Sequence, residues 1–124
     1  MIVRNLKDMA DRTVRAETWE SRRLLLRADG MGFSMHDTIL YKGTRTEMHY
    51  KNHLEAVYCI EGHAKLTDLA TGEVYELTPG SLYALNEHDH HVLEVIEDFR
   101  CVCVFNPALV GPETHGEDGA YPLL

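Results

Sequence analysis

The chain has 124 residues, 44% of them hydrophobic, and a formal net charge of −8, which predicts a single domain with one core. The negative charge disfavours nucleic acid as a partner, because phosphate binding needs a basic face. The sequence contains no run of about 18 apolar residues, so no membrane-spanning helix is expected. The N-terminal segment lacks the apolar stretch of a secretory signal, and three cysteines without zinc or CxxC spacing favour a reduced, cytoplasmic protein.

No segment shows a sustained helical period. Short alternating or apolar runs recur instead, broken by Gly, Pro, Asn and Asp, and this pattern is typical of an all-β sandwich or barrel. Residues 2–15 begin with two apolar residues and continue as a charged stretch that can form a helical turn. Strands are then expected over 16–27 and 32–41, separated by the turn signal Asp29-Gly30.

A polar cluster stands at the mouth of the next expected strand. His49, His53 and Glu55 fall within seven residues and precede the apolar run 56–60, which predicts a buried strand that ends at Gly62. Imidazole and carboxylate are the usual ligands of Fe, Zn and Mn. The cluster is therefore a candidate metal site on a rigid element.

The second half of the chain is predicted to consist of strands joined by tight turns. We expect a hairpin of residues 63–69 and 73–77, strands over 81–85, 90–96 and 99–105, and a polar turn over 86–89. The period of two places Tyr83 and His91 on neighbouring strands of a hairpin, and both side chains should point inward.

The last expected strand, 99–105, is largely apolar on both faces, so it should be covered on both sides. One face would line the interior and the other would meet a second protomer, which is the reason to expect a homodimer. The tail, 106–124, contains several Gly and Pro residues and is predicted to be a loop or lid. It carries two polar residues of interest, Glu113 and His115.

The spacing of the polar residues resembles that of the cupin superfamily. The first cupin motif, G-x5-H-x-H-x3,4-E-x6-G, is matched over 43–62, except that Lys51 stands where the second metal histidine is usual. The second motif follows at 72–80, and beyond it Tyr83 replaces another expected histidine. Two of the four usual ligands are thus replaced, so the metal site is either lost or rebuilt from other residues.

One family of cupins matches more closely. The runs HYKNHLEAVYCIEG, PGSLYALNEHDHH, VCVFNP and GEDGAYPLL together resemble the ectoine synthase family, over essentially the whole chain. The resemblance implies a single small cupin β-barrel, jelly-roll-like, formed by residues 1–124, with the tail 106–124 as a loop or lid over its mouth. It also implies a cytoplasmic, homodimeric lyase that closes N-γ-acetyl-L-2,4-diaminobutyrate to ectoine with loss of water, in compatible-solute biosynthesis.

The resemblance further implies which residues form the site. Fe(II) would be held by Glu55, Tyr83 and His91, a ligand set that Zn or Mn would also accept. Substrate contacts would come from Trp19, Arg23, Thr38, Tyr50, Cys103, Phe105 and Glu113, and His115 in the same tail is added as a further contact. Glu113 or Tyr50 is expected to act as general acid or base, Arg23 to bind the substrate carboxylate, and Cys103 is a third catalytic candidate.

Other interpretations of the same residues stay open. Glu55 also fits an edge carboxylate, Tyr83 also fits a core tyrosine, and a typical cupin would use His49 as a metal ligand. An iron-dependent dioxygenase on the same fold would need a His-rich site with open positions for O2, which the two replaced histidines disfavour. A cupin that binds a small molecule without catalysis is the third alternative.

Overall fold

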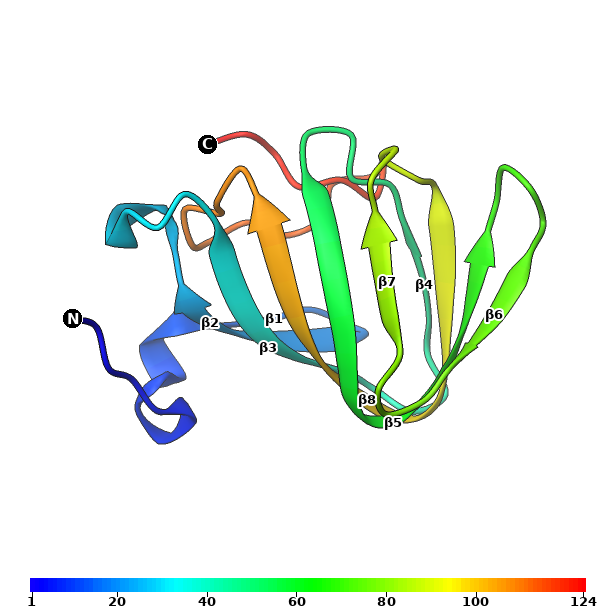
Figure 1. Ribbon diagram of the computed structural model, residues 1–124, viewed down its shortest axis with the longest axis horizontal. Coiled ribbons are helices and arrows are strands. Elements are labelled where there is room, and N and C mark those ends of the chain that lie inside the picture. Colours follow the sequence, from blue (N-terminus) through cyan, green and yellow to red (C-terminus); the bar gives the residue numbers. More distant parts are fainter.

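The structure is a computed structural model that describes residues 1–124, and it is built almost entirely of β-strands (Figure 1). The strands are β1 (Thr13–Arg15), β2 (Trp19–Leu25), β3 (Ser34–Leu40), β4 (Arg45–Met48), β5 (Leu54–Asp68), β6 (Val74–Leu77), β7 (Leu82–Leu85) and β8 (His91–Asn106). Single turns of 3₁₀ helix occur at Leu6–Asp8, Ala10–Arg12 and Arg27–Asp29. None of these helical turns is long and apolar enough to cross a membrane. The predicted all-β class is confirmed.

The strands form one antiparallel sheet in the order β1-β2-β3-β8-β5-β6, with β4 paired to β8 and β7 paired to β5. The two end strands, β1 and β6, do not pair with each other, so the sheet is folded over but does not close into the barrel that the sequence predicted. The expected hairpin between the strands of Tyr83 and His91 is also wrong, because β7 pairs with β5 rather than with β8.

The long strands β5 and β8 pair along their whole length and form the spine of the sheet. Their register runs from Leu54 opposite Asn106 to Asp68 opposite His91, with shifts between Cys59 and Ala64. In Figure 1 both strands bend at the lower edge of the molecule and continue into a second arm. The bend places the beginning of β5 and the beginning of β8 on facing arms, although they lie at opposite ends of the paired ribbon.

Gly62 lies in this bend and explains why the strand continues where the sequence predicted its end. Its φ is +93°, and a Cβ there would overlap the carbonyl group of Asp98 on β8. Only glycine permits this close approach of the two backbones. The bend therefore keeps β5 continuous, and for the same reason the two strands expected at 90–96 and 99–105 are one strand.

The inner face of the sheet holds the core, and the predicted period of two is confirmed there. Trp19, Ser21 and Arg23 are buried side by side along β2, and Phe99 and Leu93 are fully buried on β8. Burial of alternate residues is what a sheet with one covered face requires. Because Arg23 is a charged residue on this inner face, its partners have to come from within the protein.

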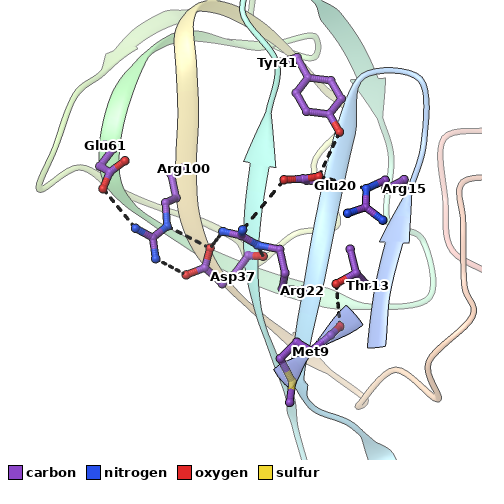
Figure 2. Close-up of polar contacts among 9 residues, drawn as sticks. All are labelled: Met9, Thr13, Arg15, Glu20, Arg22, Asp37, Tyr41, Glu61 and Arg100. Atoms are coloured by element: carbon purple, nitrogen blue, oxygen red, sulfur yellow. Dashed lines mark hydrogen bonds and ion pairs between the residues drawn. The ribbon is translucent and has the colours of Figure 1, made fainter. Parts of the chain in front are cut away.

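On the outer face, charged residues of neighbouring strands form an ionic cluster (Figure 2). Arg100 donates to both carboxylate oxygens of Asp37, at 3.1 and 2.8 Å, and to Glu61 at 3.1 Å, while Arg22 also binds Asp37. Burial opposes ionisation of Asp37, but the hydrogen bonds from the two arginines lower its pKa overall. The cluster ties together β2, β3, β5 and β8 on the side opposite the core.

The tail after β8 contains no helix or strand and crosses the upper side of the sheet in Figure 1, as predicted for a loop. It is fixed by hydrogen bonds to the body of the protein. The His49 amide donates to the Gly119 carbonyl at 3.0 Å, Asn52 donates to the Tyr121 carbonyl at 2.9 Å, and Arg27 donates to the Leu124 carbonyl at 2.7 Å. The tail therefore covers the mouth of the folded sheet.

Candidate active site

A small cavity lies beneath the tail, between the inner faces of the strands. Its volume is about 30 Å³, room for little more than one water molecule. Glu55 lines it together with six of the predicted substrate residues: Trp19, Thr38, Tyr50, Cys103, Phe105 and His115. Ser21, Leu40, Met48 and Tyr121 complete the wall. The fold thus brings together residues that are far apart in the sequence, and their contact with a substrate stays a prediction.

Tyr50 and His115 form a polar pair at the wall of this cavity. The tyrosine oxygen lies 2.8 Å from Nε2 of His115. Burial raises the pKa of Tyr50 well above its usual range and lowers the pKa of His115 to about 4. Both groups are therefore neutral near pH 7, and the hydrogen bond joins a hydroxyl and an imidazole nitrogen, each of which can donate or accept. Such a pair can pass a proton between the cavity and the tail.

Arg23 and Glu113, the two remaining predicted substrate residues, lie behind the cavity wall rather than in it. The Arg23 side chain is fully buried and donates to the carbonyl groups of Gly111 and Glu113 at 2.7 and 2.8 Å. The Glu113 carboxylate accepts the amides of Val110 and Gly111, both at 2.7 Å, and lies 3.7 Å from Arg23. In this conformation both residues hold the tail in place.

Tyr121 is the residue that the sequence analysis missed. Its ring stacks on His115 at 4.6 Å between centroids and lies 5.1 Å from the Tyr50 ring and 5.4 Å from the Phe105 ring. The guanidinium carbon of Arg23 lies 5.6 Å from its centre, within the range of a cation–π contact. Tyr121 therefore separates Arg23 from the cavity. The available signal was the single tyrosine of a tail rich in Gly and Pro.

The Cys103 thiol is packed between polar neighbours at the floor of the cavity. Its sulfur lies 3.6 Å from that of Cys101, and this contact, together with burial, raises the pKa of Cys103 well above its usual range. Thr38 and Glu55 are also neighbours of the thiol. A neutral thiol is a weak nucleophile, so the geometry supports a contact role for Cys103, and a catalytic role stays a prediction.

Glu55, Tyr83 and His91 are the residues that would hold a metal ion, and their surroundings fit one. Glu55 is buried without a cationic partner, and burial raises its pKa well above its usual range. The Nδ1–H of His91 donates to the Asp89 carbonyl at 2.8 Å, which leaves Nε2 as a buried nitrogen with a free lone pair and no hydrogen-bond partner. A cation would relieve the cost of both buried groups.

Tyr83 is the third candidate ligand beside Glu55 and His91, and without it only two ligands remain. Its ring centroid lies 6.2 Å from that of His91, and burial and the nearby Glu55 carboxylate raise the pKa of Tyr83 well above its usual range. No three His, Cys, Asp or Glu side chains form a metal cluster without it. Tyr83, which replaces a histidine of the second motif, is therefore the residue that a rebuilt site would need as its third ligand.

The other histidines of the motif region do not converge on this set. The rings of His49 and His90 stack at 4.7 Å near the surface, and His90 lies 2.9 Å from the Glu47 carboxylate. The Nδ1 of His88 hydrogen-bonds to the carbonyl groups of Tyr50 and His53. His49, the ligand position of a typical cupin, is therefore engaged in surface contacts here.

Comparison with known proteins shows the same family throughout. The family model described as ectoine synthase matches residues 1–124. The L-ectoine synthase of Desulfatibacillum aliphaticivorans is 56% identical over 128 residues, covering 100% of this chain and 98% of the relative, and that of Oceanobacillus iheyensis is 54% identical over 126 residues, covering 100% and 98%.

Solved structures agree with the sequence relatives. The crystal structure of ectoine synthase from P. lautus superposes with a TM-score of 0.90 at 52% identity, covering 100% of this chain and 91% of that one. KdgF from Halomonas sp. superposes with a TM-score of 0.65 at 16% identity, covering 77% and 86%, which supports the cupin-like fold alone. With every residue matched by the family model, the chain belongs to the ectoine synthase family and is an enzyme of the lyase class.

Proposed function

We propose that this enzyme closes N-γ-acetyl-L-2,4-diaminobutyrate to ectoine with loss of water, with Fe(II) held by Glu55, Tyr83 and His91. Family membership and the cavity beneath the tail are the observations that carry the proposal. Nucleophile and electrophile belong to one molecule, so the main task is to fold a flexible zwitterion until its α-amine meets its acetyl carbon. Walls formed by Trp19 and Phe105 can pack against the methylene groups of such a substrate.

The chemistry of the ring closure assigns a role to the Tyr50–His115 pair. Two protons leave the α-ammonium and end in the departing water. With its proton on Nδ1, neutral His115 can take the proton of Tyr50 at Nε2 while Tyr50 takes one from the ammonium, and the reverse transfer then protonates the departing oxygen. The relay runs twice, once for each of the two protons. When bound, the divalent ion supplies Lewis acidity toward the acetyl oxygen, a contribution worth several kcal/mol. Zn or Mn are further ions that this ligand set accepts.

Exclusion of water is the other requirement, since water drives the reaction backwards. The tail residues His115 and Tyr121 close the cavity from above, and Arg23 binds the tail from within. Arg23 uses two of its five N–H groups for the tail and a third for the hydroxyl of Ser21 at 3.4 Å, which leaves two for a substrate carboxylate. We propose that the tail opens for the substrate and that the carboxylate then takes the place of the Tyr121 ring beside Arg23.

The proposed setting is the cytoplasm, in compatible-solute synthesis, with the enzyme as a homodimer. Two observations support it. The three cysteines are free thiols, as expected in a reducing compartment. The outer face opposite the cavity carries Tyr58, 47% exposed, paired across strands with Leu82, 65% exposed, beside Val102 on β8. An apolar row of this kind on three strands is suited to contact with a second copy.

Proton NMR of the proposed substrate, incubated without oxygen with the purified protein, tests the proposal. We expect ectoine signals with Fe(II) and none with a chelator. Ectoine in both samples would support the proposed reaction and refute its dependence on a metal ion. No ectoine in either sample would refute the proposed reaction.

A further inference from the structure

Two cavities adjoin the candidate metal residues and share no lining residue. Glu55 lines the small inner cavity, whereas Tyr83 and His91 line a groove of about 450 Å³ between β6 and β7. The groove is formed by Leu66, Asp68, Tyr75, Glu76, Leu77, Ser81, Leu82, Tyr83, Ala84, Leu85, Asp89 and His91. It is thus about fifteen times larger than the cavity that would receive the substrate.

We propose that this groove is the entry route of the metal ion, separate from the substrate cavity, and that Asp68 and Asp89 attract the divalent cation to it. The inference rests on the proposed metal dependence and adds to it a path and two guiding carboxylates. It makes loading of the metal independent of the tail, which covers only the inner cavity.

The two carboxylates are held at the groove without being neutralised. The Asp68 carboxylate accepts the amide of Ala70 at 2.9 Å, and that of Asp89 accepts the amide of Glu87 at 3.1 Å. Neither takes part in an ion pair, whereas Glu76, the third acid of the groove, is paired with His63 at 2.5 Å. Two uncompensated charges on the walls of a groove raise the local concentration of cations.

Both acids are structurally linked to His91, the residue at the end of the groove. Asp68 is the cross-strand partner of His91 in the β5–β8 register, and the Asp89 carbonyl accepts the Nδ1–H of His91. The chain segments of the two acids are also joined, because the Leu69 amide donates to the His90 carbonyl at 3.0 Å. The carboxylates and the imidazole therefore belong to one rigid wall.

His91 supplies the independent sign of a ligand. It is 1% exposed, and its Nε2 has no partner within the protein. An unpaired buried nitrogen is costly, and this one lies in a side chain that lines the groove. A cation that arrives between Asp68 and Asp89 would thus find the free lone pair next to it.

The inner cavity offers no comparable path. The inner cavity has room for little more than one water, and Tyr50, His115 and Tyr121 pack against one another across it. A divalent ion travels with several water molecules, so it would have to displace the tail before it reached Glu55. The groove needs no such movement.

The test follows uptake of Co²⁺ by metal-free full-length protein, as bound metal after rapid desalting, without reference to turnover. Asp68→Asn/Asp89→Asn keeps both turn hydrogen bonds, because the amide oxygen still accepts, and removes both charges. We expect uptake to slow on the order of tenfold at low salt, the difference to shrink at high salt, and the final occupancy to stay the same. The matched control, Asp11→Asn/Glu17→Gln, removes the same charge far from the groove and should load like the wild type.

A second variant separates the two routes. Tyr121→Ala loosens the tail side and should leave the uptake rate unchanged. Equal rates for the wild type and the Asp68→Asn/Asp89→Asn variant, or faster uptake by Tyr121→Ala, would overturn the proposal. Absence of Co²⁺ binding in every protein would overturn it as well, and the ring closure would then be judged separately by NMR with and without chelator.

Discussion

The hydroxyl of Tyr50 and Nε2 of His115 share a 2.8 Å hydrogen bond, which joins the segment before β5 to the tail across 65 positions of the chain. Both groups are buried and neutral, and both face the inner cavity. This contact therefore serves two purposes at once: it holds the tail closed and supplies the only hydroxyl–imidazole pair of the cavity wall.

Replacing Tyr50 by Phe tests the proton transfer assigned to this pair. The ring packing against Phe105 and Tyr121 is kept, but the hydroxyl is lost. We expect kcat for ectoine formation to fall about 100-fold or more. The thermal unfolding midpoint should also fall, because Nε2 of His115 loses its partner. The rate is measured by NMR with saturating substrate and metal. Wild-type kcat in this variant would remove Tyr50 from the proton path.

We predict that the main role of Glu113 is to stabilise the tail rather than to transfer a proton. Glu113→Ala would leave the fully buried Arg23 without its carboxylate neighbour at 3.7 Å and two amides without their acceptor. We expect a loss of about 3 kcal/mol in the free energy of unfolding, measured by urea titration. The exposed neighbour Glu117→Ala is the control and should be neutral. Unchanged stability in Glu113→Ala would restore the interpretation of Glu113 as a free general base.

His36 makes stability depend on pH in the acidic range. Its pKa is lowered to about 3 by burial and by the charge of Arg23, whereas an unfolded histidine titrates near 6.5. Between about pH 6.5 and 3 the histidine is protonated in the unfolded chain but neutral in the folded protein. The contribution of His36 to stability therefore falls as the pH drops through this range. The wild type should lose stability more steeply over this window than His36→Gln in urea titrations. Parallel curves would refute the assignment.

Gly119 is expected to fix the tail on β4. Its φ is +76°, and a Cβ would lie 3.0 Å from the Glu47 carbonyl and 3.2 Å from the His49 amide. Gly119→Ala should therefore displace the tail. Trp19, the only tryptophan, lies 5.4 Å from the His115 ring and 6.4 Å from the Tyr121 ring, so its fluorescence reports the change.

The control for this prediction is Gly72→Ala. Gly72 has nearly the same φ, +78°, but nothing lies within 4 Å of a Cβ there. It shares the backbone strain of about 1 kcal/mol without the clash. Identical Trp19 spectra in the Gly119 and Gly72 variants would show that the contact with β4 does not hold the tail.

Local patterns predicted the parts of the fold that depend on local geometry. The strands expected over 16–27 and 32–41 correspond to β2 and β3, and motif spacing pointed to the family. The bend at Gly62 was missed because a glycine in a strand sequence signals a turn and a bulge equally well, and only the neighbouring backbone of Asp98 decides between them.

The candidate site was predictable by residue type but not by arrangement. Tyr83 stood out as a replaced histidine, yet its pairing with β5 depends on strand order, which the sequence does not encode locally. Arg23 was expected to face the substrate, and its coverage by Tyr121 depends on the path of the tail. Contacts between segments 100 residues apart lie beyond pattern analysis, because any of several tail paths would satisfy the same composition.

The bend of the β5–β8 ribbon has a thermodynamic consequence. Glu55 lies opposite Phe105 and His91 lies opposite Asp68, so the two belong to different arms that meet only after the ribbon has folded. An ion shared by them would be a non-covalent cross-link between the arms. Because the unfolded chain offers no such site, each tenfold rise in free metal above the dissociation constant would add about 1.4 kcal/mol to the free energy of unfolding.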